Sequence, residues 1–219
     1  MGGTLFIEYF STNPQYFFAV VISVIISITL HELAHGWMAI RLGDNTPFDS
    51  GHMTLNPLVH MGVMSLILLA MVGIAFGSMP IDPTRLRGKY AEAKVAAAGP
   101  AMNLVLGIAA IVALGLWLRF GTIPQENTPG ANGMLLLEQM GTLNIALLIF
   151  NLIPVPPLDG SHILANFSRR YRRLLSSELA QGAATAIFFA LFLGAGYFIF
   201  RAADYVMMWI IVWVVSVGR

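Results

Sequence analysis

Two histidines and a glutamate lie within five consecutive residues of an otherwise apolar stretch. His31, Glu32 and His35 fit the pattern His-Glu-x-x-His, and no charged residue occurs between positions 16 and 30. Residues four apart on a helix share one face, so both imidazole rings can bind one ion with the carboxylate beside them. The pattern predicts one Zn²⁺ ion held by His31 and His35, with Glu32 as a general base.

A catalytic zinc ion takes three protein ligands and keeps one position for water, so a third ligand is needed. The chain has no cysteine, which excludes thiolate ligands and a cysteine nucleophile. Asp159 is the best placed candidate, because three prolines precede it and such broken backbone at membrane depth usually lines a cavity. An aspartate before a helix is as often simply its N-cap, and the residues alone leave both alternatives open. The other candidate ligands are Asp82, Glu92, Glu138, His52, His60 and His162.

The composition excludes an ordinary soluble protein. Hydrophobic residues make up 57% of the 219 positions and charged residues 11%, with a mean hydropathy of +0.75. These values are typical of a polytopic membrane protein. The net charge of +1 gives no reason to expect a nucleic-acid partner. The first apolar segment lacks a preceding basic region, so we do not expect it to be a cleaved signal peptide.

The hydrophobic segments predict an all-α polytopic membrane protein with about five to six transmembrane helices. We expect a single transmembrane domain over residues 1–219, with a core at 16–164 and C-terminal helices within 175–217. The last segment is short and its full passage through a bilayer is left open. The expected apolar segments are 16–40, 95–118, 134–153, 183–200 and 205–217.

The connection between the first two core helices is harder to interpret. Residues 44–60 are rich in turn-forming residues, and we expect irregular or β-hairpin structure there at the membrane edge. Residues 61–79 are apolar but interrupted by glycines, so they either cross the bilayer or enter and return. If they return, most Lys and Arg residues lie on one side, which is then cytoplasmic, and His31 and Asp159 lie toward that same side. We therefore prefer the re-entrant interpretation, on the condition that Asp159 is a ligand.

Three motifs follow one another along the chain: His-Glu-Leu-Ala-His at 31–35, Gly-Pro-Ala-Met-Asn at 99–103 and Asn-Leu-Ile-Pro-Val-Pro-Pro-Leu-Asp-Gly at 151–160. In this order they resemble the signatures of the site-2 protease family of intramembrane zinc metalloproteases. Residues 51–57 are similar to the minimal members that lack PDZ or CBS domains, and the resemblance covers about positions 28–164. It implies zinc bound by His31, His35 and Asp159, with Glu32 as general base and Asn151 in contact with substrate.

The asparagines are candidate hydrogen-bond donors to a substrate backbone or to an oxyanion. Both Asn103 and Asn151 could serve in this way. Hydrogen bonding between helices explains Asn103 equally well. His52 and His60 are weaker candidates. The acidic residue and proline that follow the His60 position in minimal family members are replaced here by Met-Gly-Val.

The resulting hypothesis is a zinc-dependent endopeptidase that hydrolyses peptide bonds in or near transmembrane segments of membrane proteins. Its partners would be a transmembrane protein or peptide substrate and the lipid bilayer of a prokaryotic cell, with the active site toward the cytoplasm. The alternative is a multi-pass transporter or a non-catalytic zinc-binding membrane protein. Glu32 distinguishes the two, because a transporter does not need a carboxylate directly after the first histidine.

Overall fold

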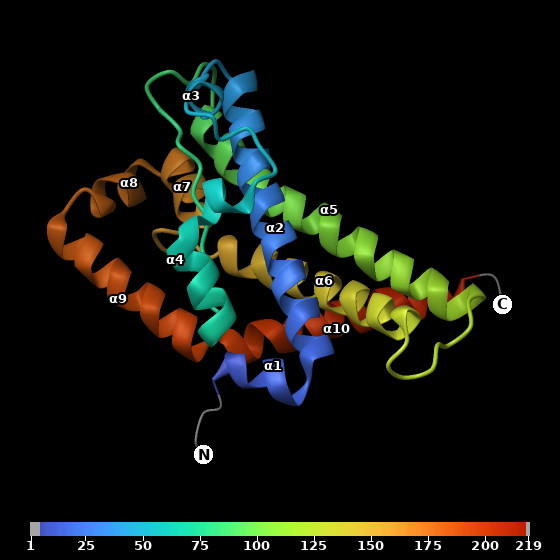
Figure 1. Ribbon diagram of the computed structural model, residues 1–219. Helices are drawn as coiled ribbons and strands as arrows, with labels where there is room; N and C mark the ends of the chain where they lie inside the picture. Colours follow the sequence, from blue (N-terminus) through green and yellow to red (C-terminus); the bar gives the residue numbers. More distant parts are fainter. Residues whose placement is uncertain (1–4, 218–219) are drawn as a thin grey trace.

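In the part of the chain that the structure describes, four helices are long and apolar enough to cross a membrane. A computed structural model describes residues 5–217, among which the regular structure is helical and includes no strand (Figure 1). The four helices are α2 (Pro14–Arg41), α5 (Ala91–Phe120), α6 (Pro129–Asn151) and α10 (Gly196–Ser216). The expected all-α polytopic class is confirmed. The shorter elements are η1 (Phe6–Glu8), α1 (Tyr9–Thr12), α3 (Thr46–Asp49), α4 (Pro57–Val72), α7 (Asp159–Phe167), α8 (Arg169–Leu175) and α9 (Glu178–Gly194).

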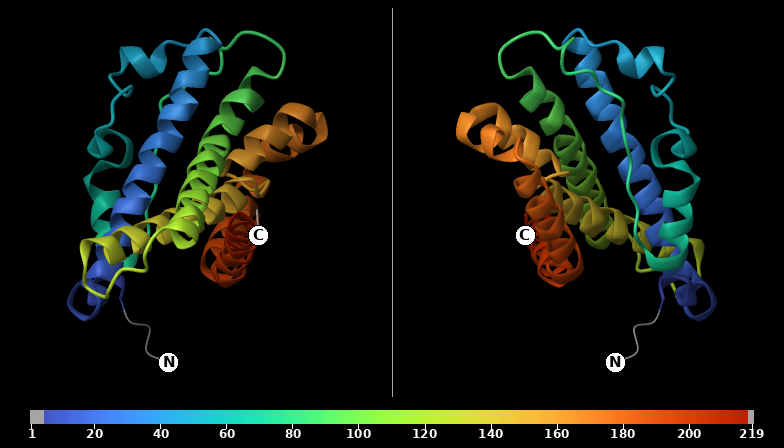
Figure 2. Two further views of the ribbon diagram at one scale, coloured as in Figure 1. Left: turned by 90° about the vertical axis from the view of Figure 1, so that its right-hand side faces the viewer. Right: turned by 90° about the vertical axis from the view of Figure 1, so that its left-hand side faces the viewer.

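The start of α2 follows the local rules for a helix N-terminus. Asn13 accepts a hydrogen bond from the Tyr16 backbone N–H at 3.1 Å, and Pro14 occupies the first helical position, where no N–H is needed. From there α2 runs beside α5 (Figure 2). The helix continues without a break through both histidines to Arg41.

Two apolar clusters hold the helices together. One lies between α5, α6 and α10, and the other lies between α2 and α4. Their buried members are mostly aliphatic side chains, which stabilise the contacts between the helices by close packing. The first cluster contains Ile111, Leu114, Ile145, Ala146, Ala203, Met207 and Ile211, and the second Val20, Val24, Ile28, Met61 and Leu69.

The segment after α4 turns back on itself. Gly73 ends the helix with a φ of 76°, in the left-handed region that favours glycine. The returning chain then pairs with α4: the Phe76 N–H donates to Ser65 Oγ at 2.9 Å and the Ser78 N–H to the His60 carbonyl at 2.9 Å. Residue 78 therefore lies beside residue 60, as the re-entrant interpretation predicts.

Residues 44–60, expected to be irregular or a β-hairpin, form no hairpin and are irregular apart from α3 and the start of α4. Pro47 within α3 and Pro57 at the start of α4 each favour a first helical turn. The number of candidate spans reaches the lower end of the expected five to six if one bent helix pair is counted. The described chain has four, or five if α8 and α9, which meet at a 92° bend, count as one broken span.

The C-terminal helices break at a different place from the one expected. The break lies at Ala195, between two glycines, whereas Arg201 and Asp204 are inside α10. Both polar residues have partners on or beside the helix: Arg201 donates to the Tyr197 hydroxyl at 3.1 Å, and Asp204 accepts from Thr142 at 3.1 Å. Because these groups are paired, they do not force the helix to end.

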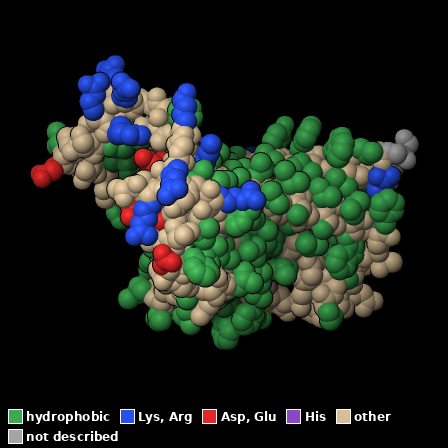
Figure 3. Space-filling model, turned by 90° about the horizontal axis from the view of Figure 1, so that it is seen from above, with side chains coloured by type: hydrophobic (Ala, Val, Ile, Leu, Met, Phe, Trp, Pro, Cys, Tyr) green, Lys and Arg blue, Asp and Glu red, His purple; other side chains and the backbone are tan. Residues whose placement is uncertain are grey.

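Positive charge gathers at one end of the molecule. Seen from above in Figure 3, Lys and Arg side chains cluster on one part of the surface, while hydrophobic side chains cover much of the remainder. The end of α2, the 73–90 segment, the start of α5 and α8 supply these charges. They carry Arg41, Arg85, Arg87, Lys89, Lys94, Arg169, Arg170, Arg172 and Arg173.

Candidate metal centre

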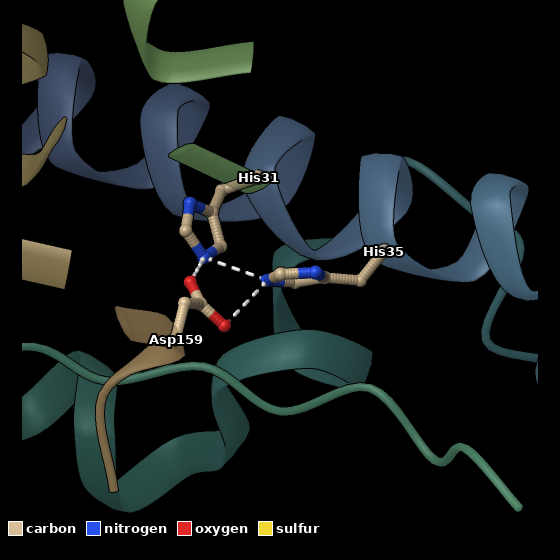
Figure 4. Close-up of side chains that lie close together, drawn as sticks. All are labelled: His31, His35 and Asp159. Atoms are coloured by element: carbon tan, nitrogen blue, oxygen red, sulfur yellow. Dashed lines mark hydrogen bonds and ion pairs between the residues drawn. The ribbon is translucent and has the colours of Figure 1, made fainter. Parts of the chain in front are cut away.

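Three side chains from two distant parts of the chain converge between α2 and the start of α7 (Figure 4). The Nε2 atoms of His31 and His35 are 2.9 Å apart. Asp159 Oδ2 lies 3.2 Å from His31 Nε2, and Oδ1 lies 3.4 Å from His35 Nε2. The expectation that Asp159 comes within reach of both histidines agrees with these distances.

The residues fit a zinc ion. At the usual bond lengths, two ligand atoms of a tetrahedral zinc site are about 3.3 Å apart, close to the distances between these donor atoms. Asp159 Oδ2 is buried and has no hydrogen-bond partner, although buried carboxylate oxygens normally have one. Two imidazoles and one carboxylate also leave the fourth position of a tetrahedral site open.

The space beside the two Nε2 atoms is kept free by a glycine on α5. A Cβ atom at Gly99 would collide with Nε2 of both His31 and His35. Gly99 is itself buried, so the close approach of α5 to α2 depends on the missing side chain. The Gly-Pro-Ala-Met-Asn motif therefore contributes room at this site as well as a polar side chain.

Both histidines are oriented by hydrogen bonds from their other ring nitrogen. The His35 Nδ1–H donates to the Val95 carbonyl at 2.7 Å, and the His31 Nδ1–H donates to Asn103 Oδ1. In these tautomers Nε2 carries the lone pair, and it faces Asp159. Such outer partners commonly fix the tautomer and ring orientation of metal-binding histidines.

Asp159 reaches the site because the chain is packed tightly around it. The residue is the first of α7, while the N-cap is Leu158, and no side chain caps this helix. The N-cap alternative for Asp159 is therefore not what the structure shows. A Cβ atom at Gly160 would collide with the carbonyl of Leu152, so this glycine allows α7 to begin directly against the end of α6.

A cavity of about 560 Å³ opens beside the three side chains. Glu32 lines it and is only 8% exposed. The returning segment 75–79 forms another part of its wall, and Gly77 approaches Glu32 so closely that a Cβ atom would lie 2.8 Å from the Glu32 Oε1 atom. Asn151 at the end of α6 and Phe188 and Phe192 of α9 also line it.

Asn103 is fully buried and lies between helices. Its Nδ2 donates to Asn144 Oδ1 at 2.9 Å while its Oδ1 accepts from His31. The alternative of hydrogen bonding between helices is thus what the structure shows for this residue. Asn151 differs, because it is only partly buried and lies on the cavity wall.

The other candidate ligands lie away from the group of three. His60 donates from Nε2 to the Thr54 carbonyl at 2.7 Å, and His52 bonds with Ser50. Asp82 accepts from Thr84 and pairs with an arginine. Among the described residues, the group that could hold a metal ion consists of His31, His35 and Asp159. Glu92 and His162 line the same cavity without joining this group, and Glu138 is exposed on α6.

Several residues that shape the site were not singled out from the sequence. They are the Val95 carbonyl, Asn144, Ser27 and Gly77. Only Asn144 carries a recognisable signal, as an amide in the middle of an apolar segment. A backbone carbonyl and a glycine acquire their roles through tertiary contacts that sequence spacing does not encode.

The chain is similar to a peptidase family and to proteins named as zinc metalloproteases or putative zinc metalloproteases. The profile of Peptidase family M50 matches residues 118–195, which include Asn151 and Asp159. The chain is 35% identical over 151 residues to a Bacillus subtilis protein named "Putative zinc metalloprotease YwhC", with 66% of each chain covered. No solved structure matches it.

Two further relatives are longer than the matched region. A Mycolicibacterium smegmatis protein named "Putative zinc metalloprotease Rip2" is 34% identical over 150 residues, covering 66% of this chain and 55% of the relative. "Zinc metalloprotease MJ0392" of Methanocaldococcus jannaschii is 29% identical over 170 residues, covering 77% of this chain and 40% of the relative. The chain thus spans about two thirds of the Bacillus protein and about half or less of the other two.

Proposed function

This chain belongs to the site-2 protease family, peptidase family M50, and from that premise we propose that it is a zinc-dependent intramembrane endopeptidase. Its substrates are peptide bonds in or near the transmembrane segments of other membrane proteins. The observation that carries the proposal is the convergence of His31 Nε2, His35 Nε2 and the Asp159 carboxylate beside a cavity within apolar helices. Intramembrane ionisable groups are costly, and a set of three around one point is best explained by function.

His31, His35 and Asp159 bind the metal in this proposal. When bound, zinc supplies Lewis acidity, which acidifies a water molecule and polarises a substrate carbonyl. The Val95 carbonyl and Asn103 hold the two imidazoles so that both Nε2 lone pairs face the ion. Asp159 contributes the negative charge that offsets part of the charge of the cation.

Glu32 is the general base and then the general acid. It lies on the cavity wall, next to the first histidine in the chain, with its carboxylate directed at the segment around Gly77. Its carboxylate takes a proton from the attacking water and returns that proton to the leaving amine nitrogen. No covalent bond between enzyme and substrate is needed.

The substrate binds as an extended peptide along residues 75–79. The N–H groups of Phe76 and Ser78 are directed at α4, and alternate residues of an extended chain direct their backbone groups to opposite sides. The N–H and C=O of Gly77 therefore face away from α4 and are available to pair with a peptide backbone. Asn151, on the cavity wall, donates a further hydrogen bond to the substrate or to an oxyanion.

The basic end of the molecule sets the orientation in a prokaryotic cell membrane. By the positive-inside rule this end is cytoplasmic, so the N-terminus of α2 lies on the outer side. His31 is ten residues from the end of α2, or about 15 Å along the helix from the basic end. Cleavage accordingly takes place in the cytoplasmic half of the bilayer. Residues 16–164 supply the catalytic core, and the C-terminal helices complete the same domain.

The test is the Glu32→Gln variant, purified and assayed for both zinc content and cleavage of a model transmembrane substrate. We expect zinc content equal to that of the wild type and a loss of cleavage of about 10²- to 10⁴-fold, the usual contribution of a positioned base. Glu138→Gln is the matched control, because Glu138 is exposed on α6. Undiminished cleavage by Glu32→Gln would contradict the role given to Glu32. Zinc binding without any cleavage by the wild type would favour the transporter or zinc-binding alternative.

A further inference from the structure

A chain of hydrogen bonds runs from His31 away from the cavity and through two asparagines. His31 Nδ1 faces Asn103 Oδ1, and Asn103 Nδ2 faces Asn144 Oδ1 at 2.9 Å. Asn144 Nδ2 in turn contacts Ser27 Oγ and the Met140 carbonyl, both at 2.8 Å. This series of hydrogen bonds thus links α2, α5 and α6.

The direction of these hydrogen bonds, from donor to acceptor, is fixed at the end farthest from His31. The Met140 carbonyl can only accept a hydrogen bond, so the Asn144 atom facing it must be the amide nitrogen. The Ser27 hydroxyl donates to the Ser23 carbonyl at 2.6 Å, so Ser27 Oγ must likewise accept from Asn144. Two backbone carbonyls therefore require the same orientation of the Asn144 amide.

The orientation of the Asn144 amide then determines which ring nitrogen of His31 carries the proton. With both N–H groups of Asn144 used, its Oδ1 is the acceptor for Asn103, which must present its own nitrogen there. Asn103 Oδ1 is consequently the atom that faces His31, and Nδ1 of His31 must carry the proton. His35 meets the same requirement directly, because its Nδ1 faces the Val95 carbonyl.

Burial makes this arrangement hard to reverse. Asn103, Asn144 and Ser27 have no exposed surface. Turning either amide around would set acceptor against acceptor, and a buried polar group without a partner is costly. Water has no exposed atom of these side chains to reach, so nothing else can satisfy them.

We propose that Asn103 and Asn144 are positioning residues for His31. Through their hydrogen bonds, the Met140 and Ser23 carbonyls fix the tautomer of His31, with Nδ1 protonated and Nε2 free for the metal. This inference rests on the proposed zinc site and assigns the two asparagines to it. Asn103 then contributes to metal binding through His31, and the substrate contact falls to Asn151.

The test compares metal binding by purified variants in detergent, with zinc affinity measured by chelator competition and the visible spectrum recorded after loading with Co²⁺. For Asn103→Leu we expect zinc affinity to fall by about 10- to 100-fold, the range for loss of an outer partner of a histidine ligand, with an altered cobalt spectrum. For Asn103→Asp we expect a smaller loss than for Asn103→Leu, because one carboxylate oxygen still accepts from His31 while the other faces Asn144 Oδ1, which is also an acceptor. For Asn144→Leu we expect a loss at the lower end of that range.

Ser23→Ala and Thr142→Val are the matched controls. The Ser23 hydroxyl is buried one turn from Ser27 but has no partner, and Thr142 is a buried polar residue on the same helix as Asn144 that bonds Asp204 instead. Both controls should bind zinc like the wild type. Any general effect of removing a buried polar group would appear in them too.

Wild-type affinity and an unchanged cobalt spectrum in Asn103→Leu would overturn the inference. If Asn103→Leu does not fold, Asn144→Leu decides, and wild-type binding by it would overturn the inference equally. Failure of the wild-type protein itself to bind zinc would instead refute the proposed metal site. The two failures are therefore distinguished by the wild-type measurement.

Discussion

The two walls of the cavity are built differently. On the wall that carries His31 and His35, each Nδ1 has a hydrogen-bond partner, and buried asparagines join the helices behind them. The second wall consists of the non-helical segment 75–79, in which Gly77 lies against Glu32, and of Phe188 and Phe192 of α9, a helix in which Ala184 is the single buried residue. Figure 1 shows α9 at the edge of the molecule, where Phe188 and Phe192 lie against Phe150 of α6 at ring-centroid distances of 6.0 and 5.9 Å. Metal ligands need fixed positions, whereas a wall that meets a peptide needs accessible groups.

A glycine on each wall makes the difference testable. Gly99 lies against both histidine Nε2 atoms, and Gly77 lies against Ile28 and Glu32. An added methyl group would collide at either place. The neighbours differ, so the same substitution should affect metal binding on one wall and catalysis on the other.

The largest effect is expected for Gly99→Ala. The new Cβ atom would occupy the space beside the two Nε2 atoms, so we expect zinc affinity to fall by at least about 100-fold, beyond the usual range for outer-shell changes. Cleavage should be lost with the metal. Gly115→Ala on the same helix is the control, because the three atoms nearest to its methyl group, from 3.0 Å, all belong to Val214 of α10. Normal zinc binding by Gly99→Ala would contradict the location given to the metal.

A smaller effect is expected for Gly77→Ala. Its Cβ atom would lie 2.6 Å from Ile28 Cγ2 and 2.8 Å from Glu32 Oε1, so the segment or the carboxylate must shift. A misplacement of about 1 Å can cost roughly 100-fold in rate, and we expect a cleavage loss of that order with zinc content unchanged. Gly182→Ala, which has open space around it, serves as the control. Loss of zinc from Gly77→Ala would remove the distinction between the walls.

The smallest effect concerns the loop that follows segment 75–79. Asp44 is fully buried and accepts hydrogen bonds from the backbone N–H groups of Thr46 at 3.0 Å and Asp82 at 2.7 Å. Burial raises the pKa of Asp44, but the hydrogen bonds from Thr46 and Asp82 outweigh it and hold the pKa below its usual value. Asp44→Ala should therefore speed tryptic cleavage of the 80–90 loop a few-fold, without changing zinc affinity.

The stabilisation of the 80–90 loop by Asp44 should depend on pH in one direction. A carboxyl group whose pKa is lowered by folding stabilises the folded form above its unfolded pKa of about 3.9 and loses that contribution as pH falls below it. Loop protection in the wild type should thus decline in acid, measured by hydrogen exchange of the 80–90 amides, and Asp44→Ala should lack this part of the decline. Asp49→Ala, which removes an exposed partner of Arg85, is the control. Equal protection in wild type and Asp44→Ala at neutral pH would show that Asp44 does not anchor the loop.

Of the two cavity walls, the one that carries His31 and His35 was the more predictable from the sequence. The spacing of His31 and His35 on one helix face predicted the zinc ion, and the family resemblance decided between the ligand and N-cap alternatives for Asp159. Both the family and the all-α class are confirmed, and the three side chains come together as a possible zinc site. The roles of Glu32 and Asn151 stay predictions.

The wall formed by segment 75–79 and α9 was less predictable, as were the C-terminal helices in general. The course of residues 61–79 could be argued only by requiring His31 and Asp159 to meet, because a glycine-interrupted apolar segment of this length can equally well cross or return. Of the two alternatives for residues 44–60, irregular or β-hairpin structure, the hairpin did not form, since two prolines began helical turns there. The break near Arg201 was misplaced because its partner Tyr197 lies on the same helix.

The central claim is that two histidines and one carboxylate bind a single zinc ion. X-ray absorption at the zinc edge of the purified, metal-loaded protein, together with its zinc stoichiometry, tests this most directly. We predict one zinc per chain with two imidazole nitrogens and with oxygen ligands at about 2.0–2.2 Å. Absence of bound zinc, or a coordination shell without imidazole, would contradict the account.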